Sequence, residues 1–171
     1  AIDAPVDFSS LVDSGINKPA RYMGHELGVV PRDWESAAVH WALTYPEVYE
    51  VGSSNLGHII LYSVLNAVPG QLCDRAYLPA PDLATRLRER QQPLFAVESR
   101  RPLLAFDILG FSLSYELGAT NILEMLDLCR VPIRAADRGD RPLTDPDAPP
   151  LIFAGGPTAT SNPEPYAPFF D

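Results

Sequence analysis

The sequence has 171 residues, of which 46% are apolar, and it carries a formal net charge of −9 at pH 7. This length is enough for one domain with its own core, and the apolar content excludes an intrinsically disordered chain. The acidic balance argues against direct binding of nucleic acid, because a phosphate backbone attracts basic surfaces.

The sequence contains two cysteines, Cys73 and Cys129, and no C-x-x-C motif. We expect two free, buried thiols in a cytoplasmic protein, with no zinc site or iron–sulfur cluster built from this chain alone. The longest apolar run falls well short of the roughly 20 residues of a membrane span, so no membrane contact is expected. The start lacks the basic and apolar regions of a signal peptide and has no Met, and we expect a fragment of a longer protein.

Residues 1–35 are expected to form an N-terminal arm. A short helix is predicted at 8–12, followed by an extended lead-in at 18–24, because Pro19 disfavours helical structure at the residue before it. We interpret the arm as packing on the surface of the domain, with contact to a neighbouring domain as the alternative.

Residues 37–44 are almost wholly apolar, which predicts a buried strand, and residues 45–57 form a turn with glycine and serine. The next segment, 56–68, has apolar residues at every fourth position and is predicted to be an amphipathic helix. We expect its apolar stripe to face the sheet, and we expect the opposite face to meet solvent, including His58, Tyr62 and Asn66.

The remaining pattern alternates strands and helices. Strands are predicted at 72–78, 106–115, 131–135 and 151–154, and helices at 82–90 and 121–129. The last helix is placed at Asn121 because Asn121 and Glu124 have capping-box spacing. Pro132 limits the strand at 131–135 to an edge position or to its own start, and residues 136–150 read as a loop.

This alternation predicts an α/β fold. We expect a doubly wound, flavodoxin-like or Rossmann-like parallel sheet of about five strands in the order 2-1-3-4-5, with helices on both faces. The domain is assigned to residues 36–160, and residues 161–171 to a linker toward whatever follows.

Three segments follow predicted strands and should meet at the carboxyl edge of the sheet, where open α/β folds bind ligands. Glycines there let a ligand approach the backbone, and helix N-termini offer free N–H groups. The alternative is that the glycines only form turns. The candidate binding residues are Glu47, Tyr49, Gly52, Ser53, Asn55, Gly57, Ser112, Ser114, Glu116, Gly155 and Gly156.

Common catalytic motifs are missing from the sequence. It has no G-x-G-x-x-G dinucleotide motif, no phosphate-binding P-loop and no G-x-S-x-G hydrolase elbow. Glu47, Glu50 and Glu116 could meet as carboxylates, but no general-acid partner or metal set accompanies them. The residues themselves therefore predict no catalysis by this chain alone.

Several runs between residues 18 and 157 do carry a resemblance. They are K-P-A-R-Y-M-G at 18–24, Y-P-E-V-Y-E-V-G at 45–52, N-L-G at 55–57, E-S-R-R-P at 98–102, F-D-I-L-G-F at 106–111, Y-E-L at 115–117, T-N-I-L at 120–123 and A-G-G-P at 154–157. Together they resemble the N-terminal cobalamin-binding-like domain of a family of radical S-adenosylmethionine (SAM) proteins.

The resemblance implies cobalamin as a candidate cofactor, with one departure from the usual pattern. In cobalamin domains a D-x-H-x-x-G motif supplies the lower His ligand, whereas here residues 47–52 keep Gly52 and place Tyr49 at the His position. The S-x-L motif falls approximately on 112–114, and the G-G on 155–156. A neutral phenol is a poor cobalt ligand, so any cobalamin would be bound without a lower His ligand, or not at all.

The family's catalytic half carries C-x-x-x-C-x-x-C, whose thiolates hold a [4Fe–4S] cluster that binds SAM. This motif is absent here, so the cluster and SAM would belong to a downstream radical SAM domain of the same chain. The resemblance thus implies an accessory cobalamin-binding-like domain of a radical SAM enzyme. The alternatives are a degenerate domain that binds no cobalamin and serves as a packing or substrate-docking module, and a free-standing flavodoxin-like binding protein.

Overall fold

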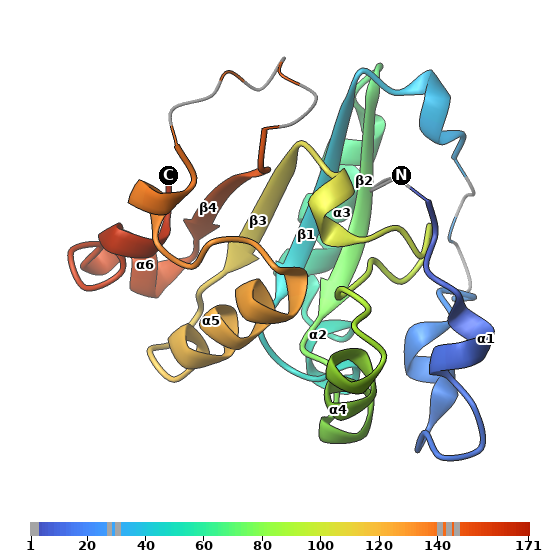
Figure 1. Cartoon of the computed structure of the whole chain (residues 1–171). Coiled ribbons are helices and arrows are strands. Elements are labelled where there is room, and N and C mark those ends of the chain that lie inside the picture. Colours follow the sequence, from blue (N-terminus) through green and yellow to red (C-terminus); the bar gives the residue numbers. More distant parts are fainter. Residues whose placement is uncertain (1–3, 27–28, 30–31, 140–141, 143–144, 146–147) are drawn as a thin grey trace.

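The computed structural model describes residues 4–26, 29, 32–139, 142, 145 and 148–171, so parts of the expected arm and of the loop at 136–150 lie outside the described residues. At its centre is an all-parallel sheet in the order β2-β1-β3-β4 (Figure 1). The strands are β1 (Val39–Tyr45), β2 (Gln71–Tyr77), β3 (Ile108–Ser112) and β4 (Leu151–Gly155). The predicted α/β class and parallel, doubly wound arrangement are confirmed.

Short and long helices connect the strands. They are α1 (Phe8–Leu11), α2 (Tyr49–Gly52), α3 (Leu56–Ala67), α4 (Pro81–Glu89), α5 (Gly118–Cys129) and α6 (Pro157–Ser161), with single 3₁₀ turns η1 (Pro19–Tyr22), η2 (Trp34–Ser36), η3 (Leu103–Ala105), η4 (Ala135–Asp137) and η5 (Ala167–Phe169). Two expected boundaries are wrong. The lead-in at 18–24 contains the turn η1, in which Pro19 occupies the first position, where its missing N–H costs nothing. Helix α5 begins at Gly118 and not at Asn121.

The predicted strand at 131–135 is absent, and the sheet has four strands where about five were expected. Helix α5 ends on Arg130 in the left-handed conformation, with φ of 61°. The guanidinium of Arg138 then donates to the carbonyls of Pro132 (2.8 Å) and Ile133 (3.3 Å). The two carbonyls therefore accept from a side chain and not from a neighbouring strand, and Pro132 has no N–H to donate to one. For these reasons the segment does not join the sheet.

The main core lies between the sheet and helices α4 and α5, which cover one of its faces. Helix α3 lies on the opposite face (Figure 1). Apolar side chains of alternate strand positions meet the buried stripes of both helices, as period-2 strands and period-3.6 helices require. Fully buried members include Leu83, Leu109, Phe111, Met125 and Ile152.

Helix α3 is rotated relative to our prediction. His58 is only 1% exposed and Asn66 is buried, whereas Leu56, Ile60 and Val64 are 68%, 51% and 56% exposed. The helix takes this orientation because polar groups of β2 face its inner side and need hydrogen-bond partners there. The Asn66 side chain donates to the Cys73 carbonyl (2.9 Å) and accepts from its N–H (3.0 Å), so both groups of this backbone unit are satisfied.

Candidate functional site

The carboxyl ends of β1 and β3 are bridged by side chains from the loops that follow them. The Tyr115 hydroxyl donates to the Glu47 carboxylate. The Asn121 side chain on α5 donates to the Pro46 carbonyl (2.8 Å) and to Glu47 Oε1 (3.4 Å). Glu47 was predicted as a site residue, but Tyr115 and Asn121 were not. The bridge occupies the point at which doubly wound sheets usually open to a ligand.

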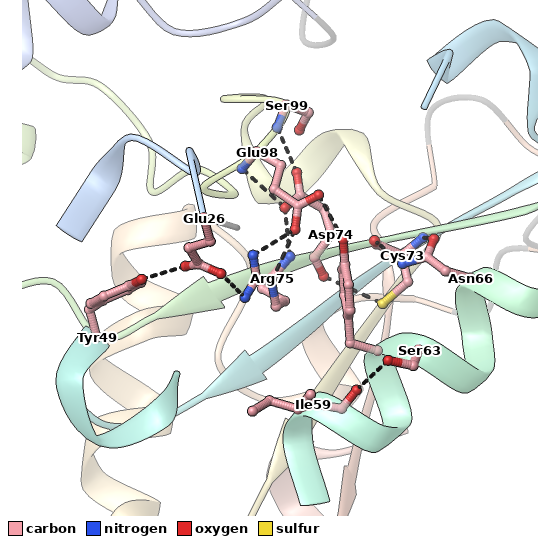
Figure 2. A network of polar contacts seen from close by, with 11 residues as sticks. Glu26, Tyr49, Ile59, Ser63, Asn66, Cys73, Asp74, Arg75, Glu98 and Ser99 are labelled. Atoms are coloured by element: carbon pink, nitrogen blue, oxygen red, sulfur yellow. Dashed lines mark hydrogen bonds and ion pairs between the residues drawn. The ribbon is translucent and has the colours of Figure 1, made fainter. Parts of the chain in front are cut away.

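Tyr49 begins α2 and points toward the N-terminal arm. Its hydroxyl donates to Glu26 Oε1 at 2.5 Å, and the other oxygen of Glu26 lies 2.5 Å from Arg75 Nη1 (Figure 2). Burial, reinforced by the Glu26 carboxylate, raises the pKa of Tyr49 to about 12. The phenol therefore keeps its proton at neutral pH and already has a hydrogen-bond acceptor.

Arg75 on β2 is the centre of a partly buried polar cluster, which we call the Arg75 cage (Glu26, Tyr62, Asp74, Arg75 and Glu98). Figure 2 shows its charged members. The Arg75 side chain is 6% exposed and pairs with Glu26 and, through Nη2 at 2.9 Å, with Glu98. Its guanidinium lies 4.7 Å from the centre of the Tyr62 ring, and the Tyr62 hydroxyl donates to Glu98 at 2.9 Å.

The carboxylates of the cage outnumber its single cation. Asp74 accepts from the N–H groups of Arg75 (2.6 Å), Glu98 (3.2 Å) and Ser99 (2.8 Å). Burial raises the pKa of Asp74, and burial followed by repulsion from Asp74 raises the pKa of Glu98 to about 7. The cage was missed from the sequence, although the charged Asp74-Arg75 pair inside the predicted strand at 72–78 was a usable signal.

The arm closes over the cage. Gly24 has a φ of +64°, and a Cβ there would lie 2.3 Å from the Val97 carbonyl oxygen, so only glycine fits where the arm crosses the domain. Lys18 and Arg21 pair with Glu50 on α2 at 3.3 and 2.8 Å, and hydrogen bonding to Arg21 lowers the pKa of Glu50 to about 2. A cavity of about 530 Å³ lies between the arm and α2 and is lined in part by Tyr49.

Four predicted site residues build the elbow between α2 and α3. A Cβ on Gly52 would come 2.4 Å from the Tyr77 ring, and Asn55 caps α3 by accepting from the N–H of His58 at 3.0 Å. Gly57 is exposed on the first turn of α3. Their positions are those of a turn between two helices, and the set comprises Gly52, Ser53, Asn55 and Gly57.

The other predicted residues lie at the ends of β3 and β4. Ser114 and Glu116 line a cavity of about 480 Å³ together with α6 and residues 162–166, and Ser112 is half-buried nearby. Gly156 has a φ of +112°, and a Cβ there would lie 2.7 Å from the Leu113 carbonyl oxygen. A Cβ on Gly155 would meet no atom within 4 Å. The expected single site is thus divided between this cavity, the bridge at Glu47 and the cavity at Tyr49.

Cobalamin, which the resemblance implied, is a poor fit to these residues. The phenol of Tyr49, which the resemblance assigned to the lower-ligand position, is neutral and bonded to Glu26. The strand ends beside it are bridged through Glu47 and Tyr115. On the sheet surface next to Gly155, the Phe153 ring lies against Gly110, where a Cβ would be 3.0 Å from it. Tyr49 therefore has no free oxygen to offer as a lower ligand, and the edge of the sheet beside it is closed by a side-chain bridge.

Among the residues that the structure describes, no three His, Cys, Asp or Glu side chains are grouped so as to hold a metal ion. No helix in that part of the chain is long and apolar enough to span a membrane. Cys73 and Cys129 are both free and buried, as expected.

The fold and its strand-end loops define a Rossmann-like α/β domain. Residues 57–171 match the family model of the N-terminal domain of radical SAM proteins, and the chain belongs to this family. The match begins in the first turn of α3, so the arm, β1 and α2 lie outside it. A domain of this family implies a further, downstream domain in the same chain. Neither a curated protein nor a solved structure matches the sequence.

Proposed function

We propose that this chain is a non-catalytic accessory domain of a radical SAM enzyme, which keeps the architecture of a cobalamin domain and binds no cobalamin. It would serve as a packing or substrate-docking module for a downstream domain that holds the [4Fe–4S] cluster and SAM. The two buried, free thiols are in keeping with a cytoplasmic protein.

One observation carries this proposal: Tyr49, which the resemblance assigns to the lower-ligand position, is hydrogen-bonded to Glu26, and Glu26 pairs with Arg75. Freeing the phenol would break its charge-assisted hydrogen bond to Glu26, and such a bond is worth about 1.5–3 kcal/mol. This bond joins α2 to the arm, so a cobalt ion approaching Tyr49 would have to compete with a contact that holds the arm in place.

The test is turnover by the full-length protein. We expect reductive cleavage of SAM to proceed at the same rate with and without added cobalamin, because the chemistry belongs to the iron–sulfur domain. Protein purified from cells grown with cobalamin should contain far less than one equivalent of it. Activity that depends on cobalamin would contradict the proposal.

A second function is favoured by the open space beside Gly155 and the cavity at Ser114 and Glu116. This cavity of about 480 Å³ has a mixed lining, in which the polar side chains are Ser114, Glu116, Thr158, Ser161 and Asn162, and it could admit a small substrate of the downstream domain that carries polar groups. Glu116→Gln should then raise the KM of the full-length enzyme for its substrate without changing its rate of SAM cleavage in the absence of substrate. An unchanged KM would contradict a substrate-binding role for this cavity.

A further inference from the structure

Helix α3 presents a wide apolar surface to solvent. We call it the α3 face, and it consists of Leu56, Ile59, Ile60, Leu61, Val64 and Val68, each at least 39% exposed. No charged residue occurs anywhere from 56 to 68, although one residue in five of the whole chain is charged. Surface helices normally carry charges on their solvent side, and contiguous exposed apolar patches mark interaction sites.

The packing of α3 holds this face outward. On the inner side, Asn66 is bonded to both backbone groups of Cys73, and Tyr62 is bonded to Glu98 and covers Arg75. Turning the helix to bury its leucines would strip these polar groups of their partners, at about 1–3 kcal/mol for each. The exposure of the apolar side is therefore fixed by the fold.

The side of the sheet on which α3 packs carries a further exposed aromatic residue. Phe153 on β4 is 38% exposed, and its ring makes an edge-to-face contact with Trp41 on β1 at 6.0 Å between centroids. Phe153 stands in register with Leu43 across Gly110. Leu43 is two residues from Tyr45, whose ring contacts His58 of α3, so Phe153 lies on the same face of the sheet as α3.

We propose that the α3 face is the docking surface for the downstream iron–sulfur domain of the same chain. The inference rests on the proposed function, because it assumes that this domain serves as a packing module. A tethered domain is present at an effective concentration of the order of millimolar, so even a modest apolar contact would be occupied. A second copy is a weaker candidate, since each copy carries a net charge of −9 and the two would repel each other.

The test is the accessibility of a cysteine on the α3 face in the full-length protein. Val64→Cys places a thiol on this face, and Leu117→Cys, at an exposed position beside α5, is the matched control. Maleimide labelling of each thiol, located by peptide mapping, is compared with its rate in urea-unfolded protein. We expect protection of at least about tenfold at position 64 and little at position 117, since buried sites react only through local opening.

A second substitution asks whether the protection comes from an interface. Ile60→Glu, in the Val64→Cys background, puts a charge into the proposed contact and should restore labelling to the rate of the control. Labelling at 64 as fast as at 117 in the original variant would overturn the proposal. Protection that disappears on dilution would also overturn it, because it would identify a second copy as the partner. Neither result depends on cobalamin, so failure here is distinct from failure of the proposed function.

Discussion

At the scale of single residues, Arg75 holds together the charged groups beneath α3. Arg75→Met would leave the Glu26 and Glu98 carboxylates beside the buried Asp74 without their cation. Breaking a buried pair in this way typically costs about 3–5 kcal/mol of the free energy of unfolding. The measurement is urea unfolding of the wild type and the variant at pH 7.

The control is Arg88→Met. Arg88 pairs with Glu124 and Asp127 at the surface, where all three side chains are at least 40% exposed, and such pairs are worth less than about 1 kcal/mol. Equal, small losses in the two variants would show that the cage is not a stabilising element.

The burial of His58 predicts that the free energy of unfolding depends on pH. Burial lowers its pKa to about 4, and neither ring nitrogen has a hydrogen-bond partner among the residues that the structure describes. The lowered pKa stabilises the fold above the ordinary value of about 6.5, and this contribution is lost as pH falls from 6.5 toward 4. His58→Phe should abolish that loss, which amounts to about 3 kcal/mol at pH 4.

The quantity to measure is the difference in free energy of unfolding between wild type and His58→Phe as a function of pH. Glu98 titrates in the same range with the opposite sign: its pKa is raised to about 7, so its contribution grows as pH falls from 7 toward 4.5. Glu98 is common to both proteins, so to first order its effect cancels in the difference. A difference that does not change with pH would contradict the buried placement of His58.

At the scale of elements, the turn from β4 into α6 distinguishes two neighbouring glycines. Gly156→Ala should destabilise the protein by about 1–3 kcal/mol, because a side chain at φ of +112° is strained and its Cβ would meet the Leu113 carbonyl. Gly155→Ala is the matched control, since a Cβ there meets open space. Thermal unfolding of both variants measures the contrast, and equal stabilities would show that the turn can relax.

Helix α3 shows why one element was correctly located but wrongly oriented. Apolar residues at every fourth position predicted its start and length to within a residue. Periodicity cannot choose between two faces when the polar one bears only His, Tyr, Ser and Asn, none of which is charged. The choice was made by partners distant in sequence, namely Arg75, Glu98 and the Cys73 backbone.

At the scale of the whole molecule, the apolar strands and their helical crossovers made the parallel α/β fold predictable. The absence of a strand at 131–135 could not be predicted from the sequence. The Pro132 and Ile133 carbonyls accept hydrogen bonds from Arg138, and this contact depends on the tertiary structure. The candidate site was predictable only in its chain positions. Glu47 and Tyr49 do follow β1, and Gly155 ends β4. The side chains that engage the first two, Tyr115 and Glu26, come from separate loops.

We propose that this radical SAM N-terminal domain binds no cobalamin. The most direct measurement is an absorbance titration of the full-length protein with hydroxocobalamin and methylcobalamin. We predict no saturable change in the cobalamin spectrum up to high micromolar concentrations, because Tyr49 is bound to Glu26 and the strand ends are bridged at Glu47. Saturable binding with a base-off spectrum would contradict the account and make this domain a cobalamin carrier.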